Sequence, residues 1–128
     1  MKVILDTNAA LFLWAAPARL SPAARALLED AGNTLIFSQV STWEICLKHQ
    51  IGKLPLPEKP GPFIRKRLER DQLVYEPISD DALFASVELP KHHADPFDRL
   101  LIATAALLRV PIVTSDPQFK AYPIDVIW

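Results

Sequence analysis

Short apolar runs that alternate with helix-length segments restrict the possible folds of this chain most strongly. The runs at 3–5, 35–37 and 112–114 are too short for helices and are typical of fully buried strands. Strands that alternate with helices favour an α/β fold with a short central parallel β-sheet flanked by α-helices. With 128 residues, the chain fits one domain, residues 1–128.

Helix-capping residues divide the rest of the chain. Ser21 and Asp95 each precede a proline, which suits the first helical position. Ser41 and Glu44 match a capping box at the start of another helix. The predicted helices lie at 9–15, 22–31, 41–51, 62–71, 79–89 and 95–109, and the predicted strands at 3–5, 35–37, 73–75, 112–114 and 124–127.

Four acidic residues lie where a carboxylate is costly: Asp6, Glu44, Asp98 and Asp116. Asp6 directly follows the first strand, and Asp116 follows the run at 112–114. Glu44 lies on the apolar face expected for its helix, and Asp98 begins the most apolar helix. A desolvated carboxylate is unfavourable unless it is paired or bound to a cation. The carboxyl ends of parallel strands share one edge, so we expect Asp6 and Asp116 to meet there.

Each acid also has a purely structural explanation. Glu44 can complete the capping box and pair with Lys48, four residues on. Asp98 suits the first turn of its helix, where the dipole favours acids, and Asp116 lies in an ordinary Ser-Asp-Pro turn. No single acid is specific, but together they indicate a site for a hard cation such as Mg²⁺. Asp95 is the competing candidate beside Asp98, and we interpret it as a structural cap.

Composition excludes several other classes of protein. A net charge of −1 gives no global basic field, so a polyanion would have to meet a local patch such as 65–70. Cys46 is the only cysteine, which excludes an internal disulfide and suits a reducing cytoplasm. No apolar run is long enough to cross a membrane. His92 and His93 lack the second His/Cys pair of a zinc finger, so we assign them no metal role.

Four stretches, taken in order, resemble the PIN-domain family, and specifically its VapC-type toxins from bacterial toxin–antitoxin pairs. They are Val-Ile-Leu-Asp-Thr-Asn at 3–8, Ser-Thr-Trp-Glu-Ile at 41–45, His-Ala-Asp-Pro-Phe-Asp-Arg-Leu-Leu-Ile-Ala at 93–103, and Thr-Ser-Asp at 114–116. The resemblance implies a PIN-like fold and a metal-dependent endoribonuclease. It also implies a homodimer and a small antitoxin partner, for which the helices near 9–15 and 22–31 are candidate surfaces.

The resemblance further implies a set of site residues. Asp6, Glu44, Asp98 and Asp116 would hold one or two Mg²⁺ or Mn²⁺ ions and carry catalysis. Supporting positions would be Thr7, Asn8 and Ser115. Basic residues near these acids are candidate contacts for RNA phosphates: Lys48, Arg65, Arg67 and Arg99.

Two other functions fit the residues. An aspartate-dependent phosphatase would use Asp6 as its nucleophile, although the second Asp usual in such enzymes is here Asn8. A non-catalytic interaction module would use the four acids only to cap helices and turns.

Overall fold

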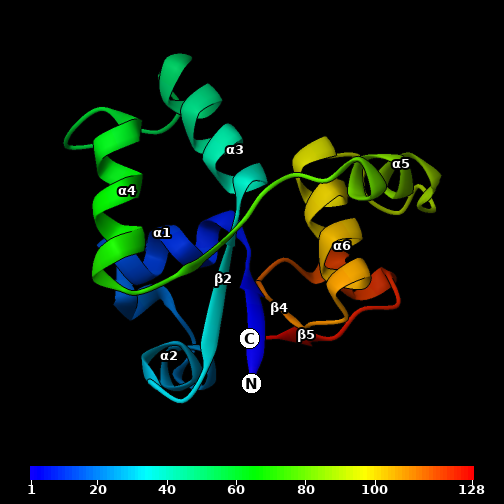
Figure 1. Ribbon diagram of the computed structural model, residues 1–128, viewed down its shortest axis with the longest axis horizontal. Helices are drawn as coiled ribbons and strands as arrows, with labels where there is room; N and C mark the ends of the chain where they lie inside the picture. Colours follow the sequence, from blue (N-terminus) through cyan, green and yellow to red (C-terminus); the bar gives the residue numbers. More distant parts are fainter.

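Five parallel strands form one central sheet with helices on both sides, as the computed structural model of residues 1–128 shows (Figure 1). The spatial order is β3-β2-β1-β4-β5, and every neighbouring pair is parallel. The predicted α/β fold is therefore confirmed. The strands are β1 (Lys2–Leu5), β2 (Thr34–Ser38), β3 (Val74–Glu76), β4 (Ile112–Val113) and β5 (Val126–Ile127).

Six α-helices and two 3₁₀ helices connect the strands. The predicted caps Ser21 and Asp95 each accept hydrogen bonds from the first helical turn that follows, and Ser79 caps α5 in the same way. The helices are α1 (Thr7–Ala15), η1 (Pro17–Arg19), α2 (Pro22–Glu29), α3 (Gln39–Gln50), α4 (Pro60–Arg70), α5 (Asp80–Glu88), α6 (Pro96–Leu108) and η2 (Pro117–Ala121). None of them combines the length and apolar character needed to cross a bilayer.

The sheet separates two hydrophobic cores. Side chains alternate between the faces of a strand, so Val3 and Leu5 of β1 point into one core and Ile4 points into the other. The first core lies against α1, α2 and α4, and the second lies against α5, α6 and η2. Figure 1 shows these two groups of helices on opposite sides of the strands. Burial on both faces explains why the strands are apolar without alternation.

The start of α3 differs from the predicted capping box. Ser38, at the end of β2, caps this helix and accepts from the backbone N–H of Val40 at 3.1 Å. Ser41 is therefore not the cap. It lies inside the first turn, fully buried, and its hydroxyl contacts that of Thr7 at 2.8 Å. Because β2 ends at Ser38, the helix begins earlier than the predicted capping box requires.

The prediction that an apolar face packs α3 against the core is wrong for most of the helix. Trp43, Leu47 and Ile51 are exposed, with 46%, 37% and 62% of their surfaces accessible. In Figure 1, α3 continues beyond the end of β2 and extends away from the sheet. Only its first turns therefore reach the core, through Val40 and Ile45.

Helix α2 ends at Glu29, earlier than the predicted boundary before Gly32. The Asp30 side chain accepts from the backbone N–H of Gly32 at 2.8 Å. This local turn competes with the next helical hydrogen bonds and ends the helix.

Candidate metal centre

The centre lies where the strand order reverses. The chain leaves β1 toward β2 and β3 on one side, and returns to β4 on the other side of β1. In open α/β sheets, the crevice at the carboxyl ends of such strands is the usual ligand site. Leu5 pairs with Val113 here, and the N–H of Asp6 donates to the Val113 carbonyl at 3.0 Å. The ends of β1 and β4 therefore place Asp6 beside the segment 114–116.

Asp6 is buried, with 5% of its surface exposed. Burial, together with the nearby charges of Glu44 and Asp116, raises the pKa of its carboxyl to about 6. The Thr114 hydroxyl opposes this by donating to Asp6 Oδ2 at 2.7 Å. The sequence did not single out Thr114, and Ser115, predicted to support the site, is exposed. Thr114 lies directly after β4 and is 1% exposed.

Glu44 reaches the centre from the buried face of α3 and is 4% exposed. The hydroxyl of Thr7 donates to Glu44 Oε1 at 2.6 Å. The ammonium group of Lys48 forms an ion pair with Glu44 Oε2, as the spacing of four residues predicts. Thr7 therefore supports the acidic cluster, whereas Asn8 is exposed and its supporting role stays a prediction.

Asp98 shows the largest electrostatic effect in the cluster. Burial and the like charges of Asp6, Asp95, Glu44 and Asp116 together raise the pKa of its carboxyl to about 8. These like charges act on Asp98 together, so the fold has brought all four predicted acids into one region. Asp95 caps α6 and accepts from the N–H groups of Phe97 and Asp98 at 2.8 and 3.2 Å, which is the structural role we expected.

His93 is the main residue that sequence reasoning missed. Its Nε2 lies 2.8 Å from Asp98 Oδ2 and 3.2 Å from Asp116 Oδ2. One ligand atom from each of the three residues lies within 4.8 Å of the others. The sequence offered only one signal, the position of His93 in the loop that leads to Asp98. A search for finger-like pairs does not find a histidine that pairs with acids from two distant segments.

The donor set suits a hard divalent cation. Asp6, Glu44, Asp98 and Asp116 offer carboxylate oxygens, which Mg²⁺ and Mn²⁺ prefer. Mutual repulsion and burial disfavour the charged form of Asp6 and Asp98, and a bound cation would relieve both effects.

The four predicted phosphate contacts differ in their availability. Lys48 is paired with Glu44 but remains 42% exposed, and Arg65 is exposed on α4. The guanidinium of Arg67 stacks on the Phe63 ring at 3.7 Å and donates to the Phe63 carbonyl.

Arg99 is fully engaged within the fold. Its two terminal nitrogens donate to oxygens of five residues: Ser86, Leu89, Pro90, His93 and Tyr122. An RNA phosphate would have to displace these bonds, so the geometry disfavours the phosphate contact predicted for Arg99.

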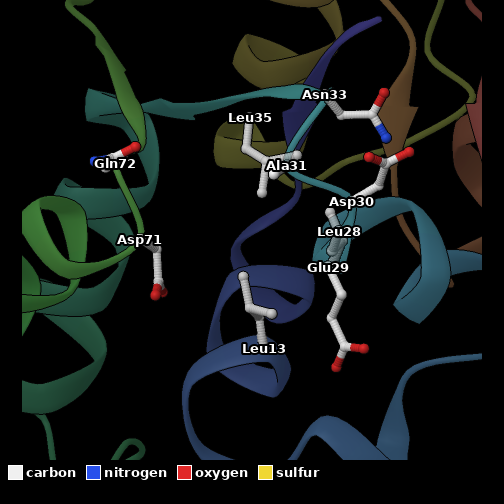
Figure 2. A pocket seen from close by; sticks show the side chains of 9 residues that line it. All are labelled: Leu13, Leu28, Glu29, Asp30, Ala31, Asn33, Leu35, Asp71 and Gln72. Atoms are coloured by element: carbon white, nitrogen blue, oxygen red, sulfur yellow. The ribbon is translucent and has the colours of Figure 1, made fainter.

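Two cavities bear on the position of the site. One of about 360 Å³ lies near the start of β2, at the sheet edge opposite the acids (Figure 2). Its carboxylates already have partners: Glu29 pairs with Arg25, Asp30 accepts from Gly32, and Asp71 pairs with Arg70.

The second cavity, of about 530 Å³, lies beside His93. Its walls include Lys91, His92 and Gln118. A cavity with exposed basic groups therefore adjoins the acidic cluster.

Together, fold and site define an α/β protein with an acidic centre at the switch point of a parallel sheet. A family model described as the PIN domain matches residues 3–125, and the chain therefore belongs to the PIN-domain family. Over 46 residues the chain is 37% identical to Ribonuclease VapC16 of Mycobacterium tuberculosis. That match covers 36% of this chain and 33% of the relative, so it spans only about a third of the relative's length.

Solved structures share the fold over nearly the whole chain. VapBC2 from Rickettsia felis, crystallised with a DNA fragment from its promoter, matches with a TM-score of 0.72 and 20% identity, over 100% of this chain and 99% of that one. A toxin–antitoxin complex from Klebsiella pneumoniae matches with a TM-score of 0.67 and 20% identity, over 98% and 96% of the two chains. At such identities the likeness is one of fold.

Proposed function

We propose that this protein is a metal-dependent endoribonuclease, the VapC-type toxin of a toxin–antitoxin pair. The observation that carries the proposal is the convergence of Asp6, Glu44, Asp98 and Asp116 at the carboxyl edge of a PIN-domain sheet. The local similarity to a protein named Ribonuclease VapC16 supports the reaction class. Hydrolysis of an RNA phosphodiester is the reaction such a site would perform.

The four acids would hold one or two Mg²⁺ ions, with Mn²⁺ as a substitute. When bound, such an ion supplies Lewis-acid polarisation of a phosphoryl oxygen. Thr114 and Thr7 orient the carboxylates of Asp6 and Glu44 through the hydrogen bonds described above. Without a cation the acids repel the RNA backbone, so RNA binding should depend on metal.

Basic groups outside the acidic cluster would bind the RNA backbone. Lys91 and His92 line the cavity beside His93, and Lys48 of α3 pairs with Glu44. Contacts of this kind make RNA binding weaker as salt increases. Arg65 lies on α4 and would extend the basic surface.

The proposed partners are a cognate antitoxin and a second copy of the chain. Toxin–antitoxin complexes among the structural neighbours support the first partner. Large apolar side chains are exposed on α3 and α5, whereas those of α1 and α2 mostly pack against the core. The exposed groups that a partner would cover are therefore Trp43, Leu47, Ile51, Leu83, Phe84 and Val87. A cytoplasmic location stays a prediction from the sequence.

Cleavage of RNA tests the proposal directly. We would incubate antitoxin-free protein with total cellular RNA in Mn²⁺ and in EDTA, beside the variants Asp98→Ala and Asp81→Ala. Asp81 is an exposed acid on α5, so its variant controls for loss of a charge away from the centre. We expect discrete fragments that require both Mn²⁺ and Asp98, with Asp81→Ala like the wild type.

Other outcomes would favour the alternatives. Intact RNA with a trapped aspartyl-phosphate on Asp6 would indicate the phosphatase. Intact RNA with no change of melting temperature in Mn²⁺ would indicate a non-catalytic module.

A further inference from the structure

His93 lies against the two most C-terminal acids of the proposed metal centre, and the inference below rests on that centre. By distance alone His93 could be a third ligand, because its Nε2 and one oxygen from each carboxylate lie within 4.8 Å of one another. The other nitrogen of the ring decides between a ligand and a hydrogen-bond donor. A neutral imidazole carries one proton, so one nitrogen donates and the other accepts.

The backbone assigns the accepting nitrogen. The N–H of Asp95 donates to His93 Nδ1 at 3.3 Å. A backbone N–H can only donate, so Nδ1 carries the lone pair and the proton resides on Nε2. This Nε2–H hydrogen bonds to Asp116 Oδ2 at 3.2 Å, and Asp98 Oδ2 lies 2.8 Å away.

A metal-binding histidine has the opposite arrangement. Its free nitrogen faces the ion, and its other N–H donates to a carbonyl or carboxylate. For His93 to bind a metal through Nε2, the proton would have to move to Nδ1. The new Nδ1–H would then point at the backbone N–H of Asp95, and two hydrogen-bond donors would face each other.

The surroundings also keep the ring from turning over. His93 is 9% exposed, and its backbone N–H donates to the Tyr122 hydroxyl at 2.9 Å. Its ring packs edge-on against Phe119 at 5.9 Å, and its carbonyl accepts from Arg99 at 3.2 Å. The loop around the imidazole is held at several points, and Nε2 stays directed at the acids.

We infer that His93 is a positioning residue: its Nε2–H holds the carboxylate of Asp116 beside that of Asp98, and its imidazole is not a metal ligand. Asp98 comes from α6 and Asp116 from the start of η2, so no covalent or helical spacing fixes their separation. Asp116 Oδ1 accepts from the N–H of Gln118 at 2.9 Å, and His93 Nε2 is the group that contacts both carboxylates. Loss of the donor should lower the affinity for every divalent cation by a similar factor. Loss of a nitrogen ligand would instead lower the affinity most for metals that prefer nitrogen, such as Zn²⁺.

The first test determines the tautomer in the metal-free protein. Nitrogen NMR of the protein labelled at histidine distinguishes a protonated from an unprotonated ring nitrogen, and His93→Gln identifies the signals that belong to His93. We expect Nε2 protonated and Nδ1 unprotonated at neutral pH. A proton on Nδ1, in the neutral or the cationic ring, would overturn the inference. This result does not depend on whether the protein cleaves RNA.

The second test compares cation binding. Calorimetric titration with Mg²⁺, Mn²⁺ and Zn²⁺ would use the wild type, His93→Leu, His93→Gln and the control His49→Gln, a histidine of α3 whose ring contacts the Leu54 carbonyl. We expect His93→Leu to weaken all three ions by a similar factor, roughly 10–100-fold. His93→Gln should recover most of the affinity, because its amide N–H₂ can donate from nearly the same place. His49→Gln should bind these ions like the wild type.

Two results would contradict the inference in this second test. A selective loss of Zn²⁺ affinity in both His93 variants would identify His93 as a ligand. Unchanged affinity for all three ions in His93→Leu would remove the positioning role. If the wild type binds no cation, the proposed metal centre fails, and the tautomer measurement still decides whether His93 donates to the acids.

Discussion

The charge on Asp98 opposes folding when no cation is bound, and Asp98→Asn should therefore stabilise the metal-free protein. Burial and neighbouring acids raise the pKa of Asp98 from its ordinary value of 3.8 to about 8. Between these values the folded state holds a proton that the unfolded state has released. Stability therefore falls as pH rises from 3.8 toward about 8, and it is higher at acid pH.

The size of this effect follows from the same values. A rise from 3.8 to about 8 corresponds to a limit of ~6 kcal/mol at 1.36 kcal/mol for each tenfold change. The side chain of Asp98 is 15% exposed, and solvent and salt screen the repulsion, so we expect about half of this, ~3 kcal/mol. Asp98→Asn removes the charge and should recover that amount at pH 8, but almost nothing below pH 3.8.

Urea unfolding in EDTA across this pH range measures the difference, with the exposed Asp81→Asn as the matched control. In Mn²⁺ the order should reverse, because the wild type gains binding energy that Asp98→Asn has lost. The electrostatic reasoning fails if Asp98→Asn in EDTA is no more stable than the wild type at pH 8, or if its advantage does not shrink toward acid pH.

Three further outcomes are expected. Thr114→Val removes the hydroxyl that donates to Asp6, so the pKa of Asp6 should rise further and calorimetry should show weaker Mn²⁺ binding; unchanged binding would exclude the supporting role. Arg99→Lys loses most of the bonds that clamp the loop before α6, and urea unfolding should show a loss of about 2–4 kcal/mol, against less than about 0.5 kcal/mol for the exposed Arg65→Lys. Lys91→Ala should weaken RNA binding and make it less steeply dependent on salt; an unchanged slope would place the RNA elsewhere.

The local sequence determined most of the architecture. Apolar runs bounded by turns located the strands, and the caps Ser21 and Asp95 located two helix starts, because both signals act over a few residues. Strand direction alone placed Asp6 and Asp116 at one edge, since parallel strands all end there.

Only the tertiary structure decided which residues surround the acids. Thr114 is 108 residues from Asp6 in the chain, and their hydrogen bond depends on β1 lying next to β4. His93 meets Asp116 through a similar long-range approach. Arg99 illustrates the same limit, because its charge suggested a phosphate contact while the loop before α6 surrounds it with carbonyl groups. The sequence shows which interactions a residue is able to form. The packing of distant elements determines which partner the residue actually contacts.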